Sequence, residues 1–423
     1  MSSTSHVRSP RPYAFDRRPL SIAPYRRLWT ASALTAVVGS FSVVAVPAQL
    51  FALTGSSAAV GAAAAVAFVA LAGAALWTGA VVDAGDARTV LLAAHGQLAL
   101  TYAVLGAHAA LGGRSLPLLM VLVACQGTAY GAIMTATGAV VPRLVPPDLL
   151  PAANSLSALT RYTGAILGPV LAGALLPAAG LAALYLCDAV TLLAVLAVVA
   201  RLPSLPPGPD GPAPPRPARS LPGRILTGFR HLAADRLLRA VLAVDLAAMV
   251  LGMPTALFPE LARHVYGGPP GGGRELGLLY AAYPAGVLAA GLLSGTFTRA
   301  RRHGALLAAA AAAWGATVVV LGLAPRLWVA LAALGLGGAV NFVLSTFRTT
   351  ISQARTDEAL RGRIQGSLTV VLIGGPQLAN LLHGTAGSLL GPRTAICAGG
   401  LLTLTAVAAV VRAVPELRHY AAR

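Results

Sequence analysis

Two acidic residues stand inside long apolar runs, where a carboxyl group could bind and release protons. Asp188 lies in LYLCDAVTLL, and Asp245 lies in VLAVDLAAMV. A carboxyl group that is removed from water favours its protonated form, which brings proton exchange toward neutral pH. Both residues are therefore candidates for proton coupling. Asp188 also has a second interpretation, in which it holds neighbouring helices together.

Arg161 is a third embedded charge, at the start of RYTGAILGPVLAG (161–173), and we expect no other arginine inside an apolar span. An arginine at the centre of a membrane helix costs roughly 2.5–3.5 kcal/mol on insertion scales, and such residues face a cavity or a partner. Arg161 is either a functional charge, and thus a further proton-coupling candidate, or a structural partner of a carboxylate or of backbone carbonyl groups. Both interpretations stay open.

The composition indicates which elements position these charges. Of 423 residues, 57% are hydrophobic and only 10% are charged, and the mean hydropathy is +0.75. Soluble domains contain roughly 25% charged residues, whereas a run of about 20 apolar residues crosses a bilayer as a helix. We predict an all-α integral membrane protein with twelve transmembrane helices, at 28–52, 57–81, 89–110, 116–140, 153–177, 180–200, 239–261, 276–298, 304–323, 327–347, 364–388 and 393–412.

A proline-rich stretch divides these helices into two sets. RLPSLPPGPDGPAPPRPARSLPG (201–223) cannot form a helix, and RILTGFRHLAADRLLRA after it can form an amphipathic helix at the membrane surface. We predict an N-terminal tail (1–27), a six-helix bundle (28–200), a linker (201–238), a second six-helix bundle (239–412) and a C-terminal tail (413–423). Most of the 31 arginines fall in the tails, the linker and alternate loops, so both termini are expected in the cytoplasm.

The charge and the motifs exclude several classes of protein. The net charge is +18, but the arginines do not cluster on one soluble face, so nucleic-acid binding is not expected. The sequence contains no lysine, which excludes a P-loop ATPase. The three cysteines are far apart in apolar spans and form neither a metal motif nor a disulfide set. We expect no enzyme activity, no metal and no cofactor.

Several segments resemble the major facilitator superfamily. They include YRRLWTASAL, VPRLVPPDLLPAANSLSALTRYTGAILGPVLAG, DLAAMVLGMPTALFPELA and GLLYAAYPAGVLAAGLLSG. The last two are similar to the exporter branch that includes enterobactin-exporter-like and multidrug efflux proteins. The resemblance covers nearly the whole chain, and it implies two six-helix repeats around a central substrate site.

GAVVDAGDAR (79–88) is similar to the first signature of this superfamily. Gly79, Asp83 and Arg88 match, whereas Ala84 and Ala87 stand where the family has basic residues. The resemblance implies a latch in which the aspartate caps a helix of the other half and holds the cytoplasmic gate shut, a contact worth about 0.3–2 kcal/mol. The alternative is that Asp83 simply ends a helix in a solvated turn.

The fifth predicted helix carries the superfamily's exporter signature at Gly164, Gly168, Pro169 and Gly173. Small residues four positions apart allow two helix backbones to approach closely, and proline removes one backbone hydrogen bond and bends a helix. The resemblance implies a hinge or packing face at the boundary between the halves, in exporters that exchange substrate for protons. The alternative is a generic small-residue packing face.

Polar residues at membrane depth are candidate substrate contacts. In the superfamily, helices 1, 4, 7 and 10 line the cavity, which favours Asp245 over Asp188 as the proton site. VACQGTAYGA (123–132) matches a helix-4 signature, but Val123 replaces the arginine implicated in proton transfer. The candidates for the cavity are Gln49, Gln126, Tyr130, Asn341 and Gln377.

The resemblance implies a secondary transporter, a multi-pass protein of the inner membrane. It would export a small amphipathic organic molecule, such as a drug, a siderophore or a secreted metabolite, by proton antiport with alternating access. Its partners would be that substrate, protons and the lipid bilayer, and we expect a monomer. Uptake or facilitated diffusion on the same fold is an alternative, and a membrane receptor or scaffold is another.

Overall fold

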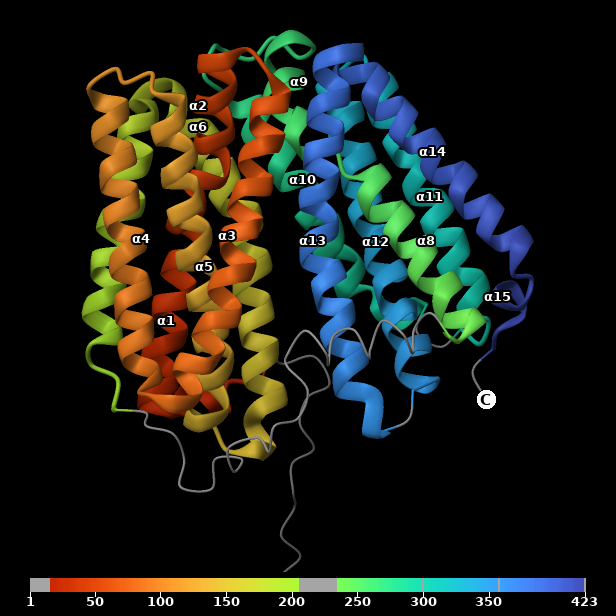
Figure 1. Ribbon diagram of the computed structural model, residues 1–423, viewed down its shortest axis with the longest axis horizontal. Helices are drawn as coiled ribbons and strands as arrows, with labels where there is room; N and C mark the ends of the chain where they lie inside the picture. The colour runs from red at the N-terminus through yellow and green to blue at the C-terminus, as the bar shows by residue number, and fades with distance from the viewer. Residues whose placement is uncertain (1–15, 205–233, 298–299, 357, 422–423) are drawn as a thin grey trace, which may run out of the picture.

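The computed structural model describes residues 16–204, 234–297, 300–356 and 358–421, and every regular element in these ranges is a helix (Figure 1). The longer elements are α1 (Ala23–Val37), α2 (Phe41–Thr54), α3 (Ser57–Ala84), α4 (Ala87–Ala110), α5 (Leu116–Leu144), α6 (Leu150–Val199), α8 (Arg236–Gly252), α9 (Phe258–His264), α10 (Arg274–Leu292), α11 (His303–Leu323), α12 (Leu327–Ala354), α13 (Glu358–Leu390), α14 (Pro392–Ala413) and α15 (Glu416–His419).

The helices form two groups that stand side by side (Figure 1). We call α1–α6 the N-terminal half and α8–α15 the C-terminal half. Ten segments of the described chain are long and apolar enough to cross a membrane. One of them, α6, is two helices that meet at Gly180, where φ is 77°, a value that glycine adopts readily. α13 is a further helix of 33 residues. Each of the twelve predicted helices thus has a counterpart, and the predicted fold class is confirmed.

The first and seventh predicted helices are interrupted. The first consists of α1 and α2 joined by the 3-10 helix η2 (Val38–Ser40), and the seventh consists of α8 and α9 joined by Met253, Pro254 and the 3-10 helix η4 (Thr255–Leu257). Proline lacks the N–H that a continuous α-helix requires, which explains the break at Pro254. Backbone groups inside these breaks need other partners, and side chains from neighbouring helices supply some of them.

Several helix boundaries differ from the predicted ones. α5 and α12 continue to Leu144 and Ala354, because hydropathy detects only the apolar part of a helix. α10 ends at Leu292 rather than at 298, and the short 3-10 helix η5 (Ser294–Thr296) follows it. α1 already begins at Ala23, inside the predicted N-terminal tail. Most of the predicted linker and its amphipathic helix lie outside the described residues.

The two ends of the bundle are distinct. We call the end with residues 84–87, 144–150 and 354–358 the linker end, and the opposite end, with 54–57, 110–116 and 264–274, the far end. In Figure 1 the far end is at the top, near α9. At the linker end the predicted C-terminal tail contains α15, whose Leu417 is fully buried and whose backbone packs on Gly304.

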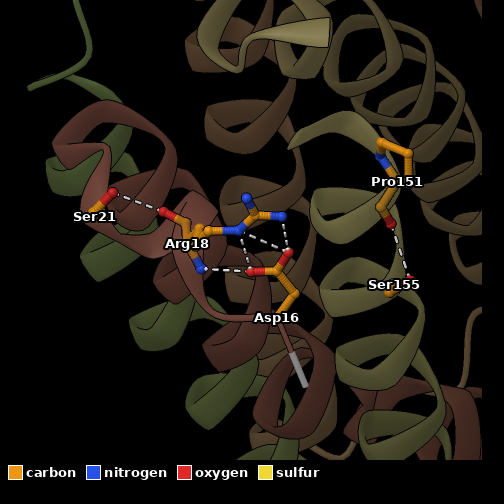
Figure 2. Close-up of polar contacts among 5 residues, drawn as sticks. All are labelled: Asp16, Arg18, Ser21, Pro151 and Ser155. Atoms are coloured by element: carbon orange, nitrogen blue, oxygen red, sulfur yellow. Dashed lines mark hydrogen bonds and ion pairs between the residues drawn. The ribbon is translucent and has the colours of Figure 1, made fainter. Parts of the chain in front are cut away.

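Polar contacts fix the chain at the linker end where it enters α1 (Figure 2). Arg18 Nη2 lies 2.6 Å from Asp16 Oδ2, and Ser21 Oγ donates to the Arg18 carbonyl at 2.7 Å. The hydrogen bonds from Arg18 hold the pKa of Asp16 below its usual value. Pro151 lies in the first turn of α6, where its missing N–H needs no partner, and its carbonyl accepts from Ser155 Oγ at 2.9 Å. These exposed contacts contribute little to stability.

The halves meet mainly through two helix pairs, α3 with α13 and α6 with α10. Both contacts use glycine. A Cβ added at Gly61 of α3 would collide with the backbone of Asn380, and one added at Gly277 of α10 would collide with the Pro169 carbonyl. Close approach of backbones through small residues is the usual packing solution in membranes. Near the far end, Ser57 Oγ also donates to Glu260 Oε2 at 2.5 Å.

Candidate transport cavity

A cavity lies between the two halves and has two chambers. The chamber nearer the far end has a volume of about 430 Å³ and is bounded by α2, α3, α5, η4, α10 and α13. The chamber nearer the linker end has about 400 Å³ and is bounded by α1, α2, α5, α6 and α10. Val43 and Tyr280 line both chambers. We therefore treat them as parts of one central cavity, of the size that holds a small organic molecule.

The far chamber has apolar walls with a few polar groups. Its apolar residues include Val46, Leu50 and Phe68. Its polar residues are Ser42, Gln126, Tyr130, Thr255, Tyr280, Gln377 and Asn380. Amides and hydroxyls of this kind orient a ligand by hydrogen bonds, while the apolar walls bury its hydrophobic part.

Three of the five cavity candidates line this chamber, namely Gln126, Tyr130 and Gln377. Gln49 is buried, accepts a hydrogen bond from the Tyr185 hydroxyl at 2.8 Å, and borders a separate surface pocket at the far end. Asn341 is half-buried on α12 and is not part of either chamber. Gln49 lies on α2, which lines the cavity with other residues, so its rotation about the helix axis turns it away from the chambers. Asn341 lies on α12, none of whose residues lines either chamber.

Arg161 lines the linker-end chamber with its side chain exposed. Among the described residues that line the two chambers, it alone carries a formal charge. Its guanidinium carbon lies 5.4 Å from the ring centroid of Tyr162, and none of the ion pairs in the described chain includes it. Of the two interpretations of Arg161, this geometry favours a charge that faces the cavity.

Asp245 is paired with a buried arginine, Arg348. Arg348 Nη1 lies 2.7 Å from Asp245 Oδ1, and the two side chains are 8% and 2% exposed respectively. The expectation that Arg161 is the one arginine inside a span was therefore wrong. Arg348 lies just past the predicted end of α12 at 347. The helix continues for about two more turns, to Ala354, because the polar sequence STFRTT also forms helix.

No ion pair within the described ranges includes Asp188. It is fully buried, and its Oδ2 accepts a hydrogen bond from the Ser42 backbone N–H at 2.9 Å. Ser42 Oγ lies 2.7 Å from the Tyr102 hydroxyl, which in turn lies 2.9 Å from the Tyr130 hydroxyl. The Gln126 amide also donates to the Tyr102 hydroxyl, at 3.1 Å. A chain of hydrogen bonds thus connects Asp188 with residues that line the far chamber.

The fifth predicted helix is residues 150–179 of α6, and its glycines make two different contacts. Gly164 and Gly168 pack against α1 and η2 of the same half, where an added Cβ would collide with Ala36 and Ser40. Gly173 instead packs across the boundary against Gly277 of α10. Pro169 lies between the two contacts. The spacing thus provides close packing on both sides of the helix, while its role as a hinge stays a prediction.

The predicted latch residues lie at the linker end of α3 and the start of α4. A Cβ added at Gly79 would meet nothing within 4 Å. Arg88 donates to the Ala200 carbonyl at the end of α6, within its own half, and its backbone N–H donates to Asp86 Oδ1 at 2.9 Å. The side chain of Asp83 lies outside the described residues. The latch therefore stays a prediction.

A family model described as "transmembrane secretion effector" matches residues 15–422, nearly the entire chain. The chain belongs to this family of the major facilitator superfamily. It is a transporter and not an enzyme. Among curated proteins, this chain is 28% identical to the enterobactin exporter EntS of Escherichia coli (strain K12), over 94% of this chain and 93% of that one. It is 29% identical, with the same coverage, to EntS of Shigella boydii serotype 18 (strain CDC 3083-94 / BS512).

Solved structures show the same fold at low sequence identity. The nucleoside transporter NupG matches with a TM-score of 0.71 and 13% identity, over 92% of this chain and 98% of that chain. A bacterial homologue of the iron transporter ferroportin, in its inward-facing state, matches with a TM-score of 0.67 and 18% identity, over 93% and 98%. These likenesses show the fold, while the family match and the exporter relatives support a secondary transporter that exports small molecules and crosses the inner membrane several times.

Some residues of the cavity were not predicted from the sequence. Thr255 and Tyr280 line the far chamber, and Asn380 joins them. Asn380 Oδ1 accepts from Thr255 Oγ1 at 2.5 Å and from the Ala256 backbone N–H at 3.0 Å. The amide thereby satisfies a backbone donor that the break between α8 and α9 leaves without a helical partner. The signal in the sequence was Pro254, which indicates that such a break needs a polar partner.

Proposed function

We propose that this protein exports a small amphipathic organic anion in exchange for protons, and that the substrate binds in the central cavity. The observation that carries the proposal is the cavity itself. It combines apolar walls, amide and hydroxyl groups in the far chamber, and the single positive charge of Arg161 in the linker-end chamber. A molecule with an apolar or aromatic body and an acidic group matches this arrangement.

Arg161 gives the proposed substrate its charge preference. Its positively charged guanidinium can bind a carboxylate or a phosphate with two parallel hydrogen bonds, or a phenolate with one. No acidic side chain borders either chamber among the described residues, so an organic cation would find no counter-charge there. The relatives named enterobactin exporters support a siderophore or a similar secreted metabolite as the cargo.

The proposed energy source is the proton gradient. The sequence lacks the lysine of a P-loop, so ATP hydrolysis within this chain has no supporting motif. A membrane potential of 100 mV supplies about 2.3 kcal/mol per charge. Two buried carboxyl groups, Asp188 and Asp245, could receive the proton. In this proposal the halves rock about the substrate, which opens the cavity first at one end and then at the other.

We also propose that the linker end and both termini face the cytoplasm, because the arginines concentrate there, and that a monomer suffices, because one chain encloses the cavity.

A second candidate is a facilitative carrier. One observation favours it. Val123 is buried where related antiporters carry an arginine.

Accumulation in inverted membrane vesicles separates these candidates, with enterobactin as the siderophore probe and ethidium as a cationic probe. The proposal predicts that energised vesicles accumulate enterobactin above its external concentration, that a protonophore abolishes the accumulation, and that ethidium is taken up less. Equilibration that ignores the protonophore indicates a facilitator. Uptake of neither probe above that of vesicles without the protein contradicts the proposed substrate class.

A further inference from the structure

We propose that Asp188 is the carboxyl group that carries the coupled proton, and that the hydroxyls of Ser42, Tyr102 and Tyr130 connect it with the central cavity. This inference rests on the proposed proton antiport. It reverses the preference for Asp245, which was based on the position of that residue on the seventh predicted helix, one of those that line the cavity in the superfamily. The path is built from three segments that are far apart in the sequence, α2, α4 and α5, around one side chain of α6.

The surroundings of Asp188 favour a neutral carboxyl group in this conformation. Its side chain is fully buried, and its Oδ1 has no hydrogen-bond partner among the described residues. The groups that face it are the backbone N–H and the hydroxyl of Ser42, and the phenols of Tyr102, Tyr130 and Tyr185. None of the ion pairs in the described chain includes it. A buried carboxylate without a cation is unstable relative to the protonated acid.

Asp245 has the opposite surroundings. Its Oδ1 lies 2.7 Å from the positively charged guanidinium of Arg348. The negative charge of Asp245 is therefore compensated in place, and the pair has no need of a proton. The two aspartates look alike in the sequence, but only Asp245 has a positively charged partner in the described chain. Asp188 is therefore the carboxyl group that we expect to lose its proton when water gains access to it.

The hydroxyls of Tyr130, Tyr102 and Ser42 provide the proposed route for the proton. Its last step runs from the Ser42 hydroxyl, which faces Asp188, because the backbone N–H of Ser42 holds the carboxyl group but does not relay a proton. Ser42 and Tyr130 both line the far chamber, and Tyr102 lies between their hydroxyls at 2.7 and 2.9 Å. When a proton moves inward, one O–H bond of a hydronium ion in the cavity breaks and leaves a water molecule, and one O–H bond forms at the Asp188 carboxylate. Each intervening hydroxyl donates one proton and accepts one, so it ends unchanged. Release follows the same steps in reverse.

The position of Asp188 also links its charge to the wall of the cavity. Oδ2 accepts from the N–H of Ser42, in the first turn of α2, directly after the 3-10 break η2. The first-turn N–H groups of a helix lack helical partners and favour a negative charge. Val43, the next residue, lines both chambers. Gain or loss of the Asp188 proton therefore changes the strength of the hydrogen bond from the Ser42 N–H to Asp188, next to the break between α1 and α2.

Two measurements test the inference, and the first needs no transported substrate. Infrared spectroscopy of the purified protein records the carbonyl band of protonated carboxyl groups as a function of pH. We expect a band that titrates in the wild type, is lost in Asp188→Asn, and persists in the double variant Asp245→Asn/Arg348→Gln. A band that is unchanged in Asp188→Asn overturns the inference, whatever the protein transports.

The second measurement compares driven and undriven transport of enterobactin in proteoliposomes. We expect Asp188→Asn to lose at least tenfold of the accumulation driven by a pH gradient, while exchange of labelled for unlabelled enterobactin continues. Asp188→Glu, which retains a carboxyl group, should recover part of the accumulation, and Tyr102→Phe should slow it. Full driven accumulation in Asp188→Asn overturns the inference. Absence of driven accumulation in the wild type instead contradicts the proposed antiport.

Discussion

Ser57, the first residue of α3, and Glu260 of α9 form a hydrogen bond of 2.5 Å that joins the two halves at the far end. Ser57 is almost fully buried there. The backbone of the same residue is in contact with Gly384 of α13, where an added Cβ would collide with the Ser57 carbonyl. The two halves are thus in direct contact at the far end. In a transporter that moves its substrate past this end, these contacts must break in each cycle.

The first prediction concerns the ion pair between Asp245 and Arg348. Removal of one partner leaves an uncompensated charge in the protein interior, and such changes cost roughly 3–5 kcal/mol. We expect Asp245→Asn and Arg348→Gln each to lower the thermal unfolding temperature of the detergent-purified protein clearly. The double variant should recover most of the loss. Single variants that unfold like the wild type would show that the pair is not formed.

The second prediction concerns the contact between Gly173 and Gly277. A methyl group at Gly277 has no space against the Pro169 carbonyl, and overpacking of this kind costs typically 1–3 kcal/mol. We expect Gly277→Ala to reduce both thermal stability and the rate of export. Gly138→Ala is the matched control, because its new Cβ meets nothing within 4 Å and alanine favours helix by up to about 1 kcal/mol. Equal effects of the two variants would contradict the close packing.

The fold could be predicted because hydropathy alone determines which segments enter a bilayer. The contacts inside the cavity could not. Asp245 and Arg348 are 103 positions apart, and Ser42 and Asp188 are 146 apart, so no local pattern brings either pair together. The end of α12 was placed before Arg348, since its last two turns are too polar to be recognised as part of a span. Rotation about the helix axes then separated Gln126, which lines the cavity, from Gln49, which does not.

The third prediction concerns the charge preference of the substrate site. Loss of the guanidinium in Arg161→Gln removes the one formal charge of the described cavity lining. We expect the KM for an anionic substrate to rise about tenfold or more, which corresponds to about 1.4 kcal/mol, with little change for a neutral analogue. Initial rates over a range of substrate concentrations measure both. Arg326→Gln, at the exposed start of α12, is the control. An equal rise for both substrates would assign Arg161 a structural role.

The most direct test of alternating access uses the contact between Ser57 and Glu260. Cys125, Cys187 and Cys397 are free thiols, so all three are first replaced by alanine. Ser57→Cys/Glu260→Cys is then treated with a short bifunctional thiol reagent that a reductant can cleave. The control is Gln97→Cys/Thr128→Cys, a pair whose wild-type side chains are 2.5 Å apart within the N-terminal half.

We expect the cross-link between the halves to stop transport of enterobactin and the reductant to restore it, while the cross-link within one half leaves transport intact. Full transport by protein that is completely cross-linked between Ser57→Cys and Glu260→Cys would contradict an exit route through the far end.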